Sequence, residues 1–207
     1  MFVVHCIILI VTLLAIRIFA LLFLKRNIGK HVGSAKTLIV LGSGGHTTEM
    51  FKILHQLNKA NYTPRIYVAA DSDKSSHSKV TEFESTATDY KFIKIFRSRN
   101  VGQSYVSSVF TTLQAIALSI PVIYHERPDL VMCNGPGTCV PICLIAFLFR
   151  AVGINTSSRI VFIESFCRIK TLSLTGRIMI WFADLFVVHW QEQKKFSKKI
   201  QCFGQLI

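Results

Sequence analysis

The sequence predicts an α/β protein with a single Rossmann-like parallel sheet behind an N-terminal transmembrane helix. Beyond residue 36, short apolar segments alternate with helix-like segments, which is the pattern of βαβ units. Most of the short segments are apolar throughout, as expected where helices cover both faces of a sheet. The first apolar run is long enough to cross a bilayer. We therefore divide the chain into a transmembrane anchor (1–24), a basic linker (25–36) and one domain (37–207).

The anchor is predicted from Phe2 to Leu24. As a helix these 23 residues span about 35 Å, enough for a bilayer core. A cleaved signal peptide is the alternative, but no basic segment precedes the run and no A-x-A-like site follows it. The interruptions are few, and we expect Arg17 to extend toward the basic flank; they are His5, Cys6, Thr12 and Arg17.

Charge predicts the orientation of the chain and the kind of ligand. Positive residues remain on the cytosolic side of a membrane, and a basic flank follows the anchor at Lys25, Arg26, Lys30, His31 and Lys36. The net charge is +13, of which Arg17 supplies one unit, so residues 25–207 carry +12. A basic body at a membrane favours anionic lipid headgroups or phosphate-bearing substrates. Nucleic acid is disfavoured because no zinc-finger or RRM signature is present.

The first half of the domain reads as three strands with helices between them. Segment 37–41 (TLIVL) is a β-rich run that ends in glycines, and the apolar residues of 46–61 form one face of a helix. Segment 65–70 (RIYVAA) is the second strand and 75–84 is a short polar helix or loop. Segment 90–96 (YKFIKIF) is the third strand.

The second half continues the alternation. Segment 104–124 is a long helix, which we expect Pro121 to kink or end. Segments 129–133 (DLVMC), 159–163 (RIVFI) and 185–188 are the fourth, fifth and sixth strands. Between them lie the helices 138–152 and 175–182, and a short helix, 191–198, follows the last strand. Helix 138–152 is apolar nearly all round, so it is either buried or rests on the membrane.

A glycine-rich turn between the first strand and the first helix is the sharpest motif. Glycines there let the backbone approach a ligand, and the helix N-terminus offers N–H groups to a phosphate. The dinucleotide fingerprint fails at Thr47, and no Walker A lysine is present. A bare strand-to-helix turn is the alternative. The candidate phosphate-binding residues in this turn are Ser43, Gly44, Gly45 and Thr47.

His46 is the candidate catalytic residue, because imidazole titrates near neutrality and can act as a base or hold a phosphate. Alternatively it faces water at the helix start. Glu49 falls about three residues into the helix, where we interpret it as a capping-box carboxylate.

Further loops follow the later strands. In doubly wound folds ligands bind outside the carboxyl ends of the strands, so these loops are expected to form one anion site with the glycine-rich turn. The candidates are Arg97 and Arg99 for the anion, and Asn134, Gly135, Pro136, Gly137, Glu164 and Ser165 for the lining. No pattern predicts a metal or a cofactor: Cys133, Cys139 and Cys143 are interpreted as small buried hydrophobes.

Four segments in series resemble a known family. They are GSGGHTTEM, RSRNVGQS, PDLVMCNGPGTCVP and RIVFIESFCRIKTLSLTG. Behind an N-terminal anchor, they resemble the membrane-anchored subunits of the eukaryotic UDP-N-acetylglucosamine transferase of the dolichol-linked oligosaccharide pathway. The resemblance covers about residues 37–190.

The resemblance implies a place on the cytosolic face of the endoplasmic reticulum. It also implies the acceptor-binding half of a GT-B glycosyltransferase, similar to the bacterial enzyme that makes lipid II. A soluble subunit would bind UDP-N-acetylglucosamine, and the pair would add the second N-acetylglucosamine to dolichyl-diphosphate-N-acetylglucosamine. The Gly44–His46 turn would meet the acceptor diphosphate, and this chain alone would be inactive.

The C-terminus departs from the family pattern. The family has Gln-Trp-Pro where this chain has His189-Trp190-Gln191, and its tail carries an arginine that is absent here. The tail residues Phe203, Gly204, Leu206 and Ile207 are expected to hold the soluble subunit. Two other readings stay open: a pure membrane scaffold for a soluble transferase, and a membrane-tethered dinucleotide oxidoreductase with Asp71 as its ribose-binding acid.

Overall fold

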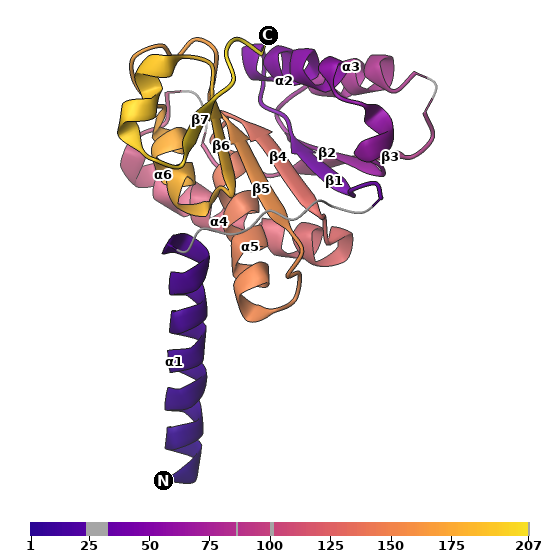
Figure 1. Cartoon of the computed structure of the whole chain (residues 1–207). Coiled ribbons are helices and arrows are strands. Elements are labelled where there is room, and N and C mark those ends of the chain that lie inside the picture. Colours follow the sequence, from indigo (N-terminus) through magenta and orange to yellow (C-terminus); the bar gives the residue numbers. More distant parts are fainter. Residues whose placement is uncertain (24–32, 86, 100–101, 207) are drawn as a thin grey trace.

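The computed structural model describes the chain apart from residues 24–32, 86, 100–101 and 207. Leu24, at the predicted end of the anchor, therefore lies outside the described residues, as do Lys25, Arg26, Lys30 and His31. A long helix, α1 (Phe2–Phe23), stands apart from an α/β body (Figure 1). Residues 37–207 of the body supply one sheet.

All pairings in the sheet are parallel, and the strand order is β3-β2-β1-β4-β5-β6-β7. The chain therefore builds outward from β1 in one direction and from β4 in the other, so the topological switch point lies between β1 and β4. The strands are β1 (Thr37–Val40), β2 (Arg65–Ala70), β3 (Tyr90–Ile95), β4 (Leu130–Asn134), β5 (Arg159–Ile163), β6 (Leu185–Val188) and β7 (Ile200–Cys202).

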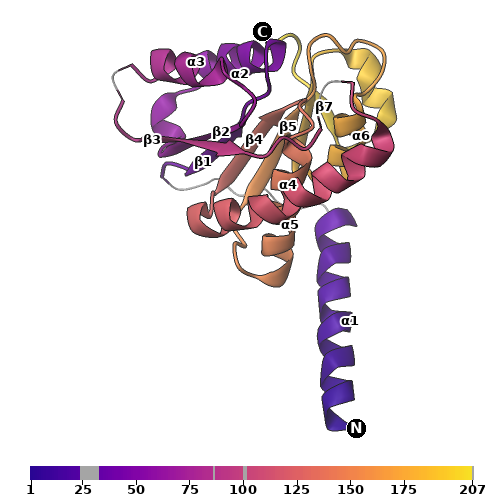
Figure 2. The same cartoon turned by 180° about the vertical axis from the view of Figure 1, so that it is seen from behind.

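Helices cover both faces of the sheet, as Figures 1 and 2 show. One face carries α2 (Gly45–Gln56) and α3 (Ser76–Phe83), and the other carries α4 (Tyr105–Glu126), α5 (Cys139–Val152) and α6 (Leu174–Phe182). Two 3₁₀ helices, η1 (Lys59–Asn61) and η2 (Gln191–Phe196), complete the body.

Successive residues of the central strands feed two separate hydrophobic cores. On β1, Leu38 and Val40 pack into the core beneath α5 and α6, whereas Ile39 packs into the core beneath α2 and α3. All three are essentially inaccessible to solvent. Burial on both faces explains why these strands are nearly continuous apolar runs, and the predicted parallel sheet is confirmed.

Several predicted boundaries were wrong. The helix expected over 46–61 ends at Gln56, and the one expected over 191–198 is a 3₁₀ helix that ends at Phe196. Helix α4 does not end at Pro121 but continues to Glu126, after which Arg127 adopts a left-handed conformation. The sequence reading also missed β7, a three-residue edge strand too short to carry a pattern.

Helix α1 is long and apolar enough to cross a membrane, and none of its residues is buried. It contacts the body near its C-terminal end, where Arg17 Nη2 donates a hydrogen bond of 3.0 Å to the carbonyl of Arg150 on α5. Arg17 therefore satisfies a carbonyl in the last turn of α5, whereas we expected it to extend toward the basic flank. Lys199 Nζ also donates to the carbonyl of Leu22, at 2.7 Å.

Helices α4 and α5 differ sharply in burial. Nine of the fourteen residues of α5 are buried, so of its two predicted roles the buried one is confirmed. Cys139 and Cys143 are among them and, with Cys133 on β4, are fully buried free thiols, as predicted. Residues Val106–Glu126 of α4, in contrast, are long and apolar enough to cross a membrane and are mostly exposed.

Candidate functional site

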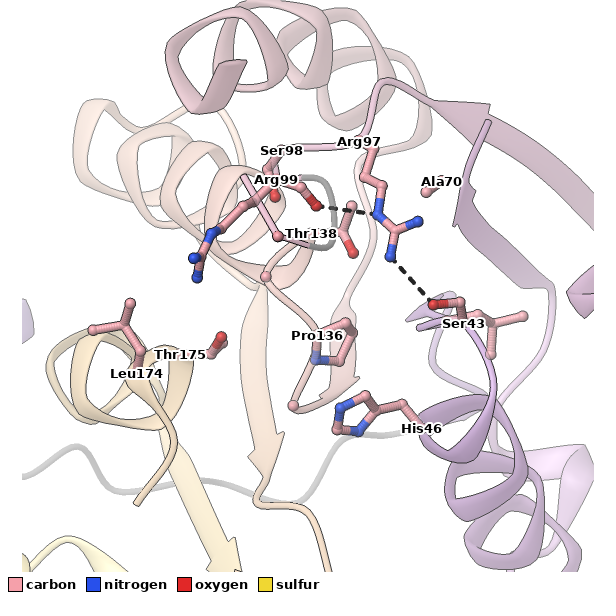
Figure 3. A pocket seen from close by; sticks show the side chains of 14 residues that line it. Ser43, His46, Ala70, Arg97, Ser98, Arg99, Pro136, Thr138, Leu174 and Thr175 are labelled. Carbon is pink, nitrogen blue, oxygen red and sulfur yellow. Dashed lines mark hydrogen bonds between the residues drawn. The ribbon is translucent and has the colours of Figure 1, made fainter. Parts of the chain in front are cut away.

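A cavity of about 380 Å³ opens at the carboxyl ends of β1 and β4, which is the switch point of the sheet. Its described lining contains two arginines and a histidine and no carboxylate, so it is suited to an anion. The lining residues are Leu41, Ser43, His46, Ala70, Arg97, Ser98, Arg99, Gly102, Gly135, Pro136, Gly137, Thr138, Leu174 and Thr175 (Figure 3).

On the β1 side of the cavity, Ser43 and His46 of the glycine-rich turn line the wall, whereas Gly44 and Gly45, predicted to bind the diphosphate, do not. Gly44 has a φ of 67° and is the N-cap of α2, without a side-chain cap of its own. The first N–H groups of a helix have no partner within it, so this end of α2 offers donors and a positive dipole end. Thr47 does not line the cavity: its hydroxyl is fully buried and contacts the Gly42 carbonyl and Ser76 Oγ. Thr47 therefore braces the turn from behind.

The second glycine loop, after β4, holds the ring of His46. Gly135 has a φ of 68°, and a Cβ atom there would lie 2.6 Å from Cε1 of His46. Similarly, a Cβ atom on Gly42 would lie 2.8 Å from the His46 Cβ and 2.9 Å from that of Pro136. Both positions therefore require glycine. The absence of a side chain there lets the two loops pack closely against His46.

Among the described residues, the hydrogen-bond and ion-pair partners of the His46 ring lie at Nδ1. Its Nδ1 lies 3.2 Å from Asn134 Oδ1 and 3.8 Å from Glu49 Oε2, the first a hydrogen bond and the second an ion-pair distance. Because an amide oxygen can only accept, Nδ1 carries the proton in this arrangement. Nε2 is therefore the atom left for a ligand.

The acid beside His46 sets its charge. The interaction with Glu49 raises the pKa of His46, against the opposing effect of burial, and Asn134 adds to the rise. Burial disfavours the charged form of Glu49, but His46, Asn134 and the hydroxyl of Ser165 outweigh it and lower its pKa. The raised pKa of His46 favours its protonated form, which together with the two arginines of the cavity suits an anionic ligand.

Arg97 links the loops after three strands. Its guanidinium donates to Ser43 Oγ at 3.3 Å and to the Arg99 carbonyl at 3.1 Å (Figure 3). It also donates to Ser72 Oγ at 3.2 Å. These bonds hold its charge over the glycine-rich turn. Arg99 is held in turn by the carbonyl of Gln103, which accepts from its Nη2 at 3.0 Å.

Glu164 and Ser165, predicted to line the cleft, lie behind the cavity. Glu164 is fully buried, and its Oε2 accepts from the backbone N–H and the hydroxyl of Ser173, the N-cap of α6. Ser165 Oγ donates to Glu49 Oε1 at 3.0 Å. These two residues therefore position α6 and Glu49 and do not themselves line the space where a ligand fits.

The C-terminal tail lies at the far end of α2. Gln56 Nε2 donates to the Leu206 carbonyl at 2.7 Å, and the Leu206 N–H donates to His189 Nδ1 at 3.3 Å. Phe203 is 62% exposed, which leaves it free to contact another molecule. Ile207 lies outside the described residues.

The structure thus places Ser43, His46, Arg97, Arg99 and Gly135–Gly137 on the cavity wall, while Asn134 contacts His46 from beneath. Sequence reasoning missed Leu174 and Thr175, which enter because the start of α6 reaches the same edge. It also missed the contact of Glu49 with His46. The capping-box interpretation of Glu49 was wrong, because α2 begins at Gly45 and its third residue is Thr47. The i,i+3 spacing from His46 was the signal available.

Comparison with known proteins places this arrangement in context. The family model described as "Oligosaccharide biosynthesis protein Alg14 like" matches residues 37–206. The human UDP-N-acetylglucosamine transferase subunit ALG14 is 45% identical over 183 residues, 84% of each chain. The subunit of the same name from Yarrowia lipolytica is 38% identical over 182 residues, which cover 86% of this chain and 83% of the relative.

The crystal structure of MurG from Acinetobacter baumannii has the same fold, with a TM-score of 0.55 at 13% identity. The match covers 82% of this chain but only 44% of MurG. The body described here therefore corresponds in fold to a part of the MurG chain.

Proposed function

The chain belongs to the Alg14 family of oligosaccharide biosynthesis proteins, and from this premise we propose that it is the membrane subunit of a two-subunit UDP-N-acetylglucosamine transferase. The pair adds the second N-acetylglucosamine to dolichyl-diphosphate-N-acetylglucosamine. This chain supplies the acceptor site, and a soluble subunit supplies the donor site. Relatives that share most of its length are named as subunits of such a transferase.

The observation that carries the proposal is the cationic cavity at the switch point. A diphosphate brings at least two negative oxygens, and the cavity faces it with Arg97, Arg99 and His46. The uncapped start of α2 adds backbone donors. Charge-assisted hydrogen bonds of this kind are roughly twice as strong as neutral ones.

In the proposed reaction, the acceptor sugar hydroxyl attacks the anomeric carbon of the donor, UDP leaves, and the configuration inverts. His46 either holds the diphosphate as an imidazolium or takes the hydroxyl proton through neutral Nε2. The raised pKa of His46 favours the first role, because a base must be neutral before it accepts a proton. Binding the diphosphate fixes the position of the sugar, and proximity accounts for a large part of the catalysis.

The proposed location is the endoplasmic reticulum membrane, with α1 as the single span and the body in the cytosol. The basic residues after the span support this orientation. Arg17 on α1 bonds to the carbonyl of Arg150 in the body, and Lys199 in the body bonds to the carbonyl of Leu22 on α1. These two hydrogen bonds support a position of the body close to the bilayer that contains the acceptor.

The proposed docking site for the soluble subunit is the C-terminal tail, with Phe203, Gly204, Leu206 and Ile207. Exposure of Phe203 supports this assignment. Relatives of this chain are named as transferase subunits, and its match covers only 44% of the MurG chain, so we propose that this chain alone transfers no sugar.

Two alternatives make different predictions. A pure scaffold would tolerate changes in the cavity, since it would only recruit the enzyme. A dinucleotide oxidoreductase would use Asp71, which is exposed at the end of β2, to hold a ribose. Against it, Thr47 replaces the third glycine of the fingerprint.

The experiment is reconstitution of the purified full chain in lipid vesicles with UDP-N-acetylglucosamine and dolichyl-diphosphate-N-acetylglucosamine, with and without the soluble subunit. Transfer is expected only with both subunits, and His46→Ala is expected to lower it. Full transfer by the chain alone, or by the pair with His46→Ala, would contradict the proposal.

A further inference from the structure

A second, mainly apolar cavity adjoins the cationic one. It has a volume of about 330 Å³ and shares five wall residues with its neighbour: Ser98, Arg99, Gly137, Leu174 and Thr175. Away from this shared wall its apolar lining comes from α4, α5 and α6, with Val109, Leu113, Val140 and Ile178. We call this cavity the α4–α6 groove.

On the α4 side of the groove, the hydroxyls of the polar residues donate hydrogen bonds to backbone carbonyls. Ser108 Oγ donates to the Ser104 carbonyl at 2.6 Å, and Thr112 Oγ1 donates to the Ser98 carbonyl at 3.3 Å. Their carbon atoms therefore complete an apolar wall. The groove and the cationic cavity together form one continuous site that is charged at one end and apolar at the other.

The apolar end is exposed to a degree unusual for a soluble protein. Val109, Leu113 and Leu174 are each more than half exposed, and Phe110 beside them is 72% exposed. Nothing in the described part of the chain covers them, and contiguous exposed apolar surface marks a site for a lipid, a ligand or a partner.

The position of α1 favours a lipid. Its last turn contacts α6, where the ring centroids of Phe23 and Trp181 lie 6.2 Å apart. Both views show α4 and α6 on the side of the body that α1 approaches, and α2 and α3 on the opposite side (Figures 1 and 2). The groove therefore lies between the cationic cavity and the level at which the span leaves the body.

We propose that the α4–α6 groove binds the first isoprene units of the acceptor's polyprenyl chain and so leads the lipid from the bilayer to the diphosphate site. This inference rests on the proposed function, because it assumes a polyprenyl diphosphate in the cationic cavity. In such a molecule the diphosphate is joined directly to the prenyl chain, which matches the junction of the two cavities at Arg99 and Leu174.

The test uses two acceptors in detergent with the full chain and its soluble partner. Both are N-acetylglucosaminyl diphosphates, one carrying a two-isoprene chain and the other only a methyl group. The variants are Leu113→Gln on the α4 wall and Ile178→Gln on the α6 wall, and neither residue lines the cationic cavity. Leu118→Gln is the matched control, because Leu118 is an exposed leucine of α4 that does not line the groove.

Leu113→Gln and Ile178→Gln are each expected to raise the KM of the prenyl acceptor about tenfold, the factor for losing about two buried methylene groups. The KM of the methyl acceptor should stay at the wild-type value, and Leu118→Gln should change neither. Equal losses on both acceptors, no loss on either, or an equal loss in Leu118→Gln would each overturn the groove assignment. The proposed function fails separately if His46→Ala turns over both acceptors at the wild-type rate.

Discussion

Oε2 of Glu49 lies 3.8 Å from Nδ1 of His46, one helical turn away, while the other carboxylate oxygen accepts the hydroxyl of Ser165. Ser165, in the loop after β5, thus positions Glu49, and Glu49 raises the pKa of His46 in the turn after β1. Of these two residues, His46 lines the cavity and Glu49 does not. The protonation of His46 therefore depends on a residue that does not line the cavity.

Glu49→Gln should shift the pH dependence of acceptor binding. Glu49 raises the pKa of His46, so the imidazole stays charged to a higher pH in the native chain. If the charged form holds the diphosphate, the acceptor KM is lowest below that pKa and rises as pH increases through it. Glu49→Gln lowers the pKa, so the rise should begin at lower pH. Steady-state kinetics across about pH 6 to 9 measure the shift. Glu82→Gln, an exposed change on α3, is the control, and superimposable profiles would contradict the role of Glu49.

Gly135→Ala should damage the site more than the fold. Its Cβ would collide with the His46 ring, and the positive φ adds about 1 kcal/mol of strain. Gly153→Ala carries similar strain at a φ of 90°, but its nearest neighbour is Arg17 Nη1 at 3.6 Å. Both variants should lower the unfolding temperature of the chain, whereas only Gly135→Ala should raise the acceptor KM. The idea fails if the two variants have equal kinetics.

Arg97→Lys keeps the charge but cannot keep three bonds. The guanidinium contacts Ser43, Ser72 and the Arg99 carbonyl together, which a lysine ammonium on a flexible stem does not reproduce. Each hydrogen bond of a charged group contributes about 1.5–3 kcal/mol. The acceptor KM should therefore rise at least about tenfold, while Arg177→Lys on the exposed side of α6 should not change it. An unaltered KM for Arg97→Lys would remove this arginine from the site.

Deleting residues 2–24 should move the protein from the membrane toward the soluble fraction. The deleted segment contains the whole of α1, none of which is buried against the body. Carbonate extraction followed by sedimentation measures the distribution. Complete retention in the membrane pellet would contradict the anchor and would assign membrane attachment to the exposed face of α4.

The sheet could be predicted because local and global signals agree in it. Strands such as β1 (Thr37–Val40) and β2 (Arg65–Ala70) are buried at every position and are mostly apolar, and each is followed by a helix. The ends of helices and strands could not be predicted from the sequence where tertiary contacts override local conformational preference. Pro121 lies within α4, and β7 is defined only by its pairing with β6.

The site was predictable to the extent that it consists of loops at one sheet edge. The sequence could place Gly135 and His46 near one another, because both follow strands whose carboxyl ends lie at one edge of the sheet. Their contact depends on the φ of 68° at Gly135, which no sequence pattern specifies. The sequence pattern could not predict whether a side chain points into the cavity or into the interior of the protein. Thr47 and Glu164 read as ligand contacts, and both are fully buried in bonds that support the site.

The most direct test of the account is whether this chain binds the acceptor without its partner. The measurement is equilibrium binding of labelled N-acetylglucosaminyl diphosphate carrying a two-isoprene chain to the purified full chain, with inorganic diphosphate as competitor. We expect saturable binding that diphosphate displaces. Gly135→Ala and His46→Ala should weaken it, and Gly153→Ala should retain it. Binding that appears only with the soluble subunit present, or that is equal in all four proteins, would contradict it.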